Sequence, residues 1–313
     1  MDTTTQLPAS LMEAIRYFSD PQVCVDFFAD LKWGNAGPSC PLCGERDLLY
    51  LKSRRIWKCR PCEKQFSVKV GTILEDSPIG LDKWACAMWM LGNCKNGVSS
   101  YEISRSIKVT QKSAWFLLHR IRYAVHQGSI SKLSGEVEVD ETFIGGKARN
   151  IHRDKRAEKI TGRGPEGKTI VAAVLERGGM VHAKVVGTRK KGDLQKLVRE
   201  HVEGGSMLYS DALKSYDGLN ADYTHQVIDH AVEYVNGSVH TNGLENFWSL
   251  LKRSIRGTYV SVEPYHLFRY LDEQAFRFNA RKSNDGERFL RVGAGIAGKR
   301  LTYKTLIGKG GSL

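Results

Sequence analysis

Four cysteines in two close pairs constrain this chain more than any other feature of its sequence. Cys40 and Cys43 form one Cys-x-x-Cys turn, Cys59 and Cys62 form a second, and fifteen residues separate the two turns. Each turn can place two thiolates on one cation, and four sulfurs in a tetrahedron form a closed Zn²⁺ site without an open coordination position. Because residues 34–70 are too few for an apolar core, the spacing predicts a zinc ribbon that folds around a structural metal ion.

Redox or iron–sulfur chemistry on the same cysteines is the competing hypothesis, which the knuckle-like turns beside the strand-like pieces LLYLKS and RIWKCR disfavour. The chain has seven cysteines, an odd number that fits a reducing compartment better than a disulfide framework. We expect the other three, Cys24, Cys86 and Cys94, to be core residues. Basic residues of the ribbon favour DNA as its partner, although many ribbons bind only protein; these are Lys52, Arg54, Arg55, Lys58 and Arg60.

The charge balance indicates a polyanionic partner. Among 313 residues, 47 Lys and Arg stand against 34 Asp and Glu, which gives a net charge of +13 and a pI near 9.4. Nucleic acid is the first candidate and an anionic membrane surface the second. The sequence has no apolar run of about 18 residues and no apolar signal segment, so we expect a cytoplasmic protein that does not enter a membrane.

The regions on either side of the ribbon show helical periodicity. Residues 1–33 predict two short helices with a break at Asp20-Pro21. Residues 71–132 predict three helices with a short turn before the last, in an arrangement that resembles a helix-turn-helix. The last helix would begin near Thr110 and present its first residues, Gln111, Lys112 and Ser113, to DNA. A helical linker without a DNA-binding role remains the alternative.

The pattern changes after Ser134. Three successive strand-like segments, a helix, a fourth strand and further helices predict a mixed sheet flanked by helices over residues 134–281, in the order of the ribonuclease H-like plan. The fold class is therefore α+β and multidomain, with a zinc ribbon and a helix-turn-helix-like region followed by a ribonuclease H-like α/β domain. Residues 147–168 hold eight Lys or Arg and three acids, which predicts a basic loop for phosphate contact or a solvated loop. We expect residues 282–313 to form a basic, Gly-rich tail that is loosely ordered after Arg291.

Three acidic residues of this domain fall on elements that would bring them together. We expect Asp140 to end the first strand, Asp211 to end the fourth, and Glu245 to lie in the first turn of a long helix. Since the two strands are neighbours in a ribonuclease H-like sheet, the carboxylates would form a site for two Mg²⁺ or Mn²⁺ ions that promote phosphoryl transfer. Each acid also has an ordinary interpretation. The aspartates are typical turn residues, and Glu245 has the spacing from Asn242 of a capping box.

The long helix is amphipathic. An apolar stripe predicts its buried side, and it comprises Leu244, Phe247, Trp248, Leu251 and Ile255. Another face carries Glu245, Ser249, Lys252 and Arg256, so Lys252 would lie two turns from the acid on the same side. There it would hold a DNA phosphate or remain a solvated lysine. His240 precedes the helix and would orient substrate or serve only a structural role.

Several of these segments together resemble a known family. VDETFIGGK, YSDALKSY, HTNGLENFWSLLKRSIRGTY and PYHLFRYLDEQAFRFNAR are similar to the zinc-ribbon transposases of bacterial insertion sequences, the ISXO-like group of DDE transposases. The resemblance covers the chain from the helices before CPLCG to about Arg281. It implies a ribonuclease H-like domain that nicks element ends and joins the freed 3′-hydroxyls to target DNA with a divalent metal. It places the first two acids on Asp140 and Asp211.

The third metal ligand is the open point of the resemblance. Members of the group carry Glu or Asn at this position with a downstream Lys, and HTNGLEN contains both Asn242 and Glu245. We choose Glu245 because a carboxylate binds Mg²⁺ better than an amide does, and Lys252 matches the downstream lysine. Asn242 remains the competitor.

The resulting hypothesis is a DNA transposase that binds terminal inverted repeats and catalyses metal-dependent cleavage and strand transfer. Its partners would be double-stranded DNA, as element ends and as target, and further copies of the chain in a dimer or higher oligomer near the bacterial nucleoid. Two alternatives are a non-catalytic zinc-ribbon DNA-binding regulator and a ribonuclease H-like nuclease.

Overall fold

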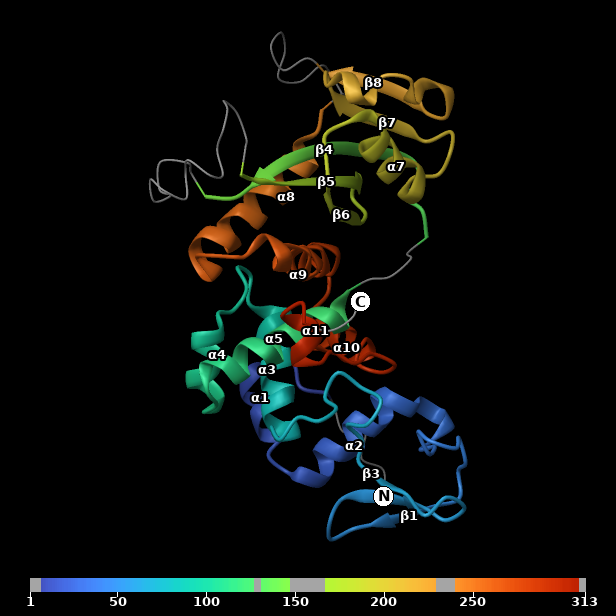
Figure 1. The fold of residues 1–313 in the computed structure, drawn as a ribbon, viewed down its shortest axis with the longest axis vertical. Helices are drawn as coiled ribbons and strands as arrows, with labels where there is room; N and C mark the ends of the chain where they lie inside the picture. The colour runs from blue at the N-terminus through green and yellow to red at the C-terminus, as the bar shows by residue number, and fades with distance from the viewer. Residues whose placement is uncertain (1–6, 127–130, 147–166, 229–239, 310–313) are drawn as a thin grey trace. The chain divides into compact units, whose positions relative to one another are not determined.

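A computed structural model describes residues 7–126, 131–146, 167–228 and 240–309 of the chain (Figure 1). The structure divides into two compact units. The first combines Met1–His126 with Ala280–Leu313, and the second is Gln127–Asn279. Within the described ranges, no helix is both long and apolar enough to cross a membrane.

The first unit opens with the two predicted short helices, α1 (Leu11–Tyr17) and α2 (Pro21–Trp33). The break between them is confirmed: the Asp20 side chain caps α2 by accepting from two backbone amides, and Pro21 occupies the first helical position. Proline is tolerated there because its missing N–H has no partner in the first turn of a helix.

The ribbon is a small antiparallel sheet of three strands. Strands β1 (Leu48–Leu51), β2 (Ile56–Cys59) and β3 (Gln65–Phe66) pair in that order, after a short 3₁₀ turn at Gly34–Ala36. The first two strands confirm the predicted segments. Trp57 stacks on Phe66 with ring centres 6.1 Å apart, and both side chains are buried.

Three helices follow the ribbon, as predicted. They are α3 (Leu81–Asn93), α4 (Ser100–Ile107) and α5 (Gln111–Val125). Thr110 caps α5, which confirms the expected start of the last helix. Lys112 is exposed at this helix end, whereas Gln111 is half-buried and donates to the Ser100 hydroxyl over 2.8 Å, which ties α5 to α4.

The prediction of loose order after Arg291 is wrong for the residues described there, which end at position 309. Helix α10 (Asp285–Ala294) runs past Arg291, α11 (Tyr303–Leu306) follows it, and Val292 and Ile296 are buried. Phe289 is 1% exposed and stacks on Phe27 with ring centres 5.5 Å apart. It also lies 5.3 Å from the ring of Trp89. The glycines that suggested a tail come after this apolar face, which packs into the first unit.

The second unit contains a five-stranded sheet in the order β6-β5-β4-β7-β8. The strands are β4 (Glu136–Ile144), β5 (Thr169–Glu176), β6 (Val181–Val186), β7 (Met207–Asp211) and β8 (Thr224–Ile228). The first three are antiparallel, whereas β7 runs parallel to β4 and β8 runs parallel to β7. This is the mixed sheet of the ribonuclease H-like plan. Of the predicted basic insertion, residues 147–166 lie outside the described ranges.

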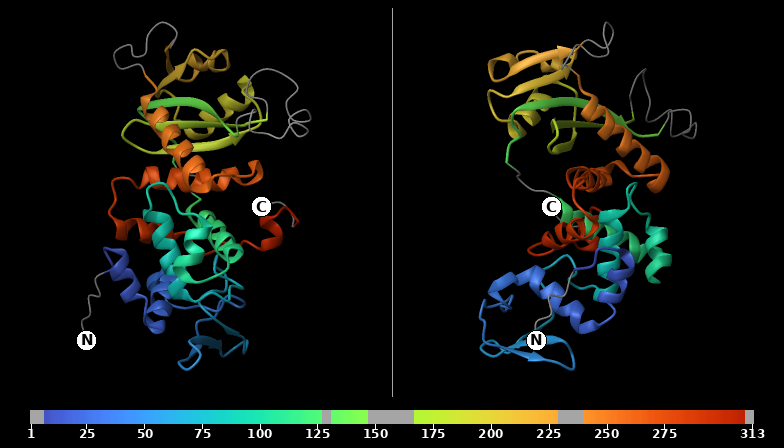
Figure 2. Two further views of the ribbon diagram at one scale, coloured as in Figure 1. Left: turned by 90° about the vertical axis from the view of Figure 1, so that its left-hand side faces the viewer. Right: turned by 180° about the vertical axis from the view of Figure 1, so that it is seen from behind.

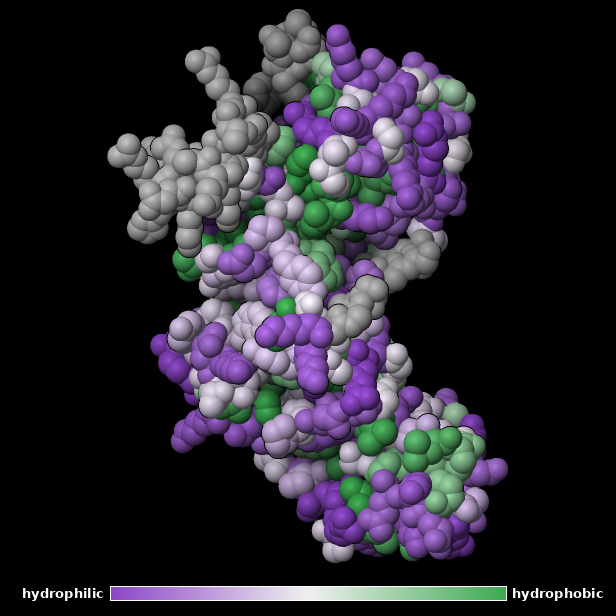
Figure 3. All heavy atoms as spheres, in the orientation of Figure 1, coloured by the Kyte–Doolittle hydropathy of each residue, from purple (hydrophilic) through white to green (hydrophobic). Residues whose placement is uncertain are grey.

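Helices cover both faces of this sheet (Figures 1 and 2). Helix α7 (Lys191–His201) packs on one face in an apolar core that includes Val137 and Val139 of β4. On the face drawn in Figure 3, hydrophilic residues cover the outer side of α7. Helices α8 (Asn242–Arg253) and α9 (Leu267–Asn279) pack in a second core on the other face. Since strand residues alternate between faces, Glu138 and Asp140 point toward α8.

Short helical turns complete the second unit. They are 3₁₀ turns at Lys214–Tyr216, Leu219–Ala221 and Pro264–His266, and a π-helical turn at Ser254–Tyr259 that continues α8.

Candidate functional site

The four ribbon cysteines are already gathered for one metal ion. The Sγ atoms of Cys40 and Cys62 lie 3.6 Å apart, those of Cys43 and Cys59 lie 3.5 Å apart, and all four lie within 4.8 Å of one another. A tetrahedral Zn²⁺ site with bonds of about 2.3 Å has sulfur–sulfur edges of about 3.8 Å. The cysteines therefore fit zinc in a closed, structural site, as the spacing predicted.

Backbone hydrogen bonds shape the turns that hold these sulfurs. The Gly44 amide donates to the Cys40 carbonyl over 2.9 Å, and Gly44 has a φ of 79°, which glycine adopts without strain. At the second turn the Cys59 amide donates to the Lys64 carbonyl over 2.9 Å. Each Cys-x-x-Cys pair is thus fixed by contacts close to it in the sequence.

The sheet of the second unit brings two of the predicted acids onto adjacent strands. The parallel ladder pairs Glu138 of β4 with Tyr209 of β7. Asp140 and Asp211 each lie two residues beyond this last pair, and the Asp211 charge acts on the Asp140 carboxyl, so the two acids lie near each other on adjacent strands. Asp211 ends β7 as predicted. The expectation that Asp140 ends its strand is wrong, because β4 continues to Ile144 in the ladder with β5.

Helix α8 supplies the other predicted residues. Glu245 lies in its first turn as predicted, and both Glu245 and Lys252 line a cavity of about 590 Å³ with Asp140. The full lining is Asp140, Glu141, Thr142, Glu245, Trp248, Ser249, Lys252, Arg253 and Arg256. Asp211 is not among these lining residues. The cavity thus has acids on its strand side and cations further along the helix.

The alternative interpretation of Glu245, a capping box with Asn242, is wrong. Asn242, the competing candidate for the third metal ligand, is not the N-cap of α8. The N-cap of α8 is Thr241, which makes no side-chain capping bond, and Asn242 is the exposed first residue of the helix. Glu245 therefore has no reciprocal bond with Asn242, which would have given the acid an ordinary local role.

The carboxyl of Asp140 has a strongly shifted pKa. Burial first, and then the negative charges of Glu141 and Asp211, raise the pKa of this carboxyl to about 7. Two donors oppose the shift: Trp248 Nε1 donates to Oδ2 over 2.9 Å, and the Glu141 amide donates to Oδ1 over 2.8 Å. A divalent cation beside Asp140 would favour its charged form.

The three acids are less tightly gathered than the cysteines. Among the residues that the structure describes, the cysteine group is the one set of three or more potential ligands whose atoms all lie within 4.8 Å. Asp140, Asp211 and Glu245 share one region of the sheet without forming such a set. Carboxylate oxygens are nevertheless the ligands that Mg²⁺ and Mn²⁺ prefer, and their charge and the adjoining cavity fit such an ion.

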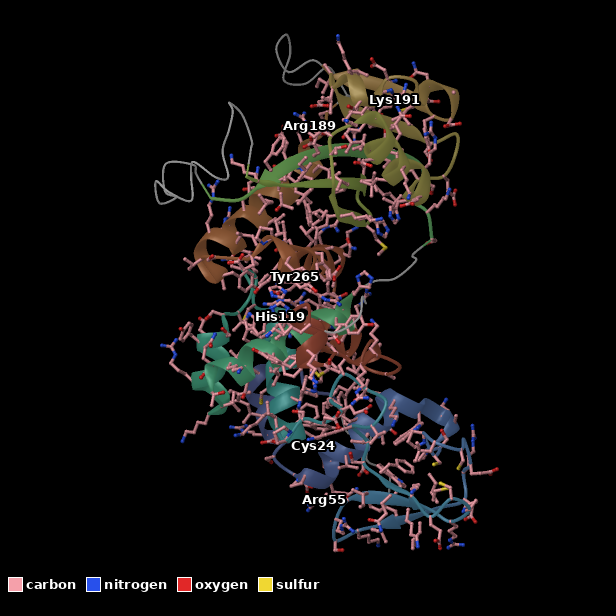
Figure 4. All side chains as sticks on the ribbon, in the orientation of Figure 1. Cys24, Arg55, His119, Arg189, Lys191 and Tyr265 are labelled. Carbon is pink, nitrogen blue, oxygen red and sulfur yellow. The ribbon has the colours of Figure 1, made fainter. Side chains whose placement is uncertain are left out.

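Residues that the sequence analysis missed support the site from its edges. Glu141 accepts from Arg189 Nη2 over 2.5 Å and from the Tyr216 hydroxyl over 2.8 Å. Arg189 lies just before α7, near Lys191, as labelled in Figure 4. Trp248 belongs to the predicted apolar stripe, yet its indole N–H contacts Asp140. The sequence did give one signal for Glu141, namely that it is an acid directly next to Asp140.

The basic wall of the cavity is formed by α8. Lys252 is half-buried, and burial and the nearby Arg256 lower the pKa of its ammonium group. Arg253 and Arg256 are exposed. Three cations beside a group of acids suit a phosphodiester, whose negative oxygens would otherwise be repelled by the carboxylates.

Comparisons with known proteins match both the ribbon and the sheet unit. Residues 132–279 match the ISXO2-like transposase domain, and residues 19–65 match the transposase zinc-ribbon domain. A protein of Halobacterium salinarum, described as an uncharacterized protein in transposable element ISH50, is 27% identical over 77% of this chain and 85% of its own length. An uncharacterized transposase-like protein of Haemophilus influenzae is 31% identical over 32% of this chain and 80% of its own length.

Proposed function

Because the chain belongs to the insertion-sequence transposases that join a zinc ribbon to an ISXO2-like transposase domain, we propose that it cleaves DNA at element ends and transfers the cut strands to target DNA. The observation that supports this most is the cavity where Asp140 meets Glu245 and Lys252, with Asp211 on the strand beside Asp140. Acids for a divalent metal and cations for a phosphodiester lie together there.

Within this proposal Asp140, Asp211 and Glu245 hold the catalytic Mg²⁺ or Mn²⁺, and Lys252 binds a DNA phosphate. Such ions, when bound, activate the attacking oxygen and stabilise the leaving oxygen in an in-line displacement. The protein's own contribution is to orient the DNA backbone between the acids and the cations of α8. Trp248 keeps the Asp140 carboxylate turned toward the cavity, and Arg189 neutralises Glu141, so that its charge does not add fully to that of Asp140.

The first unit would supply DNA recognition. We propose that the zinc ribbon and the start of α5, with its exposed Lys112, dock on the terminal inverted repeats. The net charge of +13 supports a nucleic-acid partner. Joining two element ends requires at least two active sites, so we also propose a dimer or a larger oligomer in the synaptic complex.

The test is a cleavage and joining assay on DNA that carries the element ends, with the Asp140→Asn variant beside the wild type. We expect Mg²⁺-dependent nicking and joined products from the wild type. The variant should lose at least roughly 10³-fold in rate and keep its affinity for the ends, since one charge of the metal site is gone while the first unit is intact. End binding without any nicking by the wild type would indicate a regulator. Hydrolysis without joined product would indicate a nuclease.

A further inference from the structure

Helix α8 carries two proposed functional residues, yet its first turn has no capping side chain of its own. The first amides of a helix lack partners within the helix, and Thr241 makes no side-chain bond to them. The backbone amide of Leu244 instead donates to Glu138 Oε2 over 2.9 Å. Glu138 comes from strand β4, 106 positions earlier in the chain, and its side chain is 1% exposed. A carboxylate there also faces the positive end of the helix dipole.

A second contact holds the segment that enters the helix. Arg177, at the β5–β6 turn, pairs with Glu138 Oε1 over 3.1 Å and donates from Nη2 to the His240 carbonyl over 2.8 Å. The His240 ring also lies near this pair, with Nδ1 3.5 Å from Glu138 Oε1. The Glu138–Arg177 ion pair thus contacts the start of α8 at two points, the Leu244 amide and the carbonyl of His240, the residue before the N-cap. The structural role that was one of two options for His240 is the one that these contacts support.

Gly243 makes this close approach possible. A Cβ atom at position 243 would lie 2.7 Å from Glu138 Oε2 and 2.9 Å from Leu175 Cδ2, both closer than real contacts. A larger residue would force the ends of the Glu138 and Leu175 side chains to shift, whereas glycine lets the first turn of α8 rest on the carboxylate. The glycine in HTNGLEN is therefore explained by Glu138, although glycine is otherwise unfavourable in a helix.

We infer that Glu138 is a positioning residue: it fixes the first turn of α8 and thereby sets the Glu245 carboxylate against Asp140. Glu245 directly follows Leu244, whose amide Glu138 accepts, and Asp140 lies two residues after Glu138 on the same face of β4. One buried carboxylate therefore links the two sides of the proposed metal site. This inference rests on the proposed function, since it assigns a role to Glu138 in holding the metal ligands.

Two variants of the full-length, zinc-loaded protein test the inference. Glu138→Gln removes the charge that pairs with Arg177, and Gly243→Ala separates the helix from an unchanged Glu138. Because alanine favours helix formation more than glycine does, a loss in Gly243→Ala cannot come from helix propensity. The matched control is Glu136→Gln. Glu136 lies on the same strand and pairs with Arg177 over 3.7 Å, but it accepts from the Tyr209 hydroxyl rather than from α8.

The first readout needs no catalytic metal. Amide hydrogen exchange at Leu244 and Glu245 should become at least roughly tenfold faster in both test variants and stay near the wild-type rate in the control. The second is Mn²⁺ binding by titration calorimetry or electron paramagnetic resonance. Loss of an outer-shell partner typically weakens a metal site by about 10–100-fold, and we expect both test variants to fall in this range. Cleavage should then recover at high Mg²⁺ concentration.

The outcomes separate the inference from the proposed function. If Asp140→Asn abolishes Mn²⁺ binding while Glu138→Gln and Gly243→Ala bind Mn²⁺ as the control does, the positioning role is overturned and the metal site stands. If the wild type shows no Mn²⁺ binding that depends on Asp140, the proposed function fails first. Should Glu138→Gln not fold, Gly243→Ala decides alone, because it retains both the Glu138 and the Arg177 side chains.

Discussion

The zinc cluster and the carboxylate cavity, for which we propose a divalent metal ion, are gathered to different degrees in the protein. The four sulfurs lie within 4.8 Å of one another, whereas the three acids are not gathered that closely. The sulfurs contact one another in pairs, Cys40 with Cys62 and Cys43 with Cys59. Carboxylates repel, and the raised pKa of Asp140, about 7, reflects that burial and its acidic neighbours disfavour its charge. A metal ion bound there, as we propose, would neutralise these charges.

The two sites also differ in what depends on the metal. The cysteines come from two turns within 23 residues, in a ribbon that has few apolar contacts. The acids come from two strands and a helix that are already held by apolar cores on both faces of a sheet. Zinc should therefore decide whether the ribbon folds, whereas Mg²⁺ should change only the local geometry and charge of the sheet unit.

The largest expected effect is the loss of zinc. Removing the ion, or changing Cys59→Ser, should unfold residues 40–66, because zinc contributes on the order of 10 kcal/mol to modules of this kind. Hydrogen exchange followed by mass spectrometry would show the ribbon amides exchanging freely while β4 and β5 stay protected. Cys86→Ser, a half-buried cysteine of α3 outside the cluster, is the control and should leave the ribbon protected. If the ribbon amides stayed protected from exchange without zinc, folding would not depend on the metal at either site.

A smaller effect should come from the charge of Asp140 in Mg²⁺-free protein. Its folded-state pKa of about 7 lies above the ordinary value of 3.8, so the folded state holds the proton more tightly than the unfolded state does. The associated stability is complete below pH 3.8 and is lost as the pH rises through 7. The Asn side chain of the Asp140→Asn variant does not titrate, so the variant does not lose this stability as the pH rises. Its free energy of unfolding relative to the wild type should increase by on the order of 3 kcal/mol between about pH 4 and pH 8.

Denaturant unfolding at several pH values measures this difference, with stoichiometric zinc present so that the ribbon stays folded. The change with pH is the informative quantity, because Asn also replaces an acceptor of two hydrogen bonds and so shifts the stability at every pH. Parallel stability curves for the variant and the wild type would show that Asp140 is not under electrostatic strain. Mg²⁺ should stabilise the wild type at pH 8 and have less effect on the variant.

Local patterns predicted most of the architecture. Alternation located the strands, and the Cys-x-x-Cys spacing located the zinc ligands, because both depend on residues close in the sequence. The tail was mispredicted because its glycines outweighed the apolar residues of α10, such as Phe289, whose partners Phe27 and Trp89 lie more than 190 positions earlier. A pattern of apolar spacing does not show whether a distant surface is available to cover it.

Long-range polar contacts set the limit for the candidate site. The pairing of Asp140 with Asp211 followed from the predicted sheet order, and the shared face of Glu245 and Lys252 followed from helical spacing. The burial of Glu138 did not, because an acid at an alternating position of a strand is usually exposed. Its partners, the Leu244 amide and Arg177, become visible only when three elements meet in space.

The smallest expected effect tests whether Trp248 tunes the acid that it contacts. Trp248→Phe removes the N–H that donates to Asp140 Oδ2, and this hydrogen bond lowers the Asp140 pKa, so that pKa should rise by about one unit, or about 1.4 kcal/mol. Protons then compete better with the metal: Mn²⁺ affinity should fall up to about tenfold near pH 6.5, and the deficit should vanish by about pH 9, where the carboxyl is ionised in both proteins.

Phe247→Leu is the control, because it disturbs the same apolar core without removing a donor to Asp140. It should weaken binding, if at all, equally at both pH values. If Trp248→Phe lowered the Mn²⁺ affinity equally at both pH values, the indole would contribute only apolar packing. Burial and neighbouring charges alone would then set the Asp140 pKa.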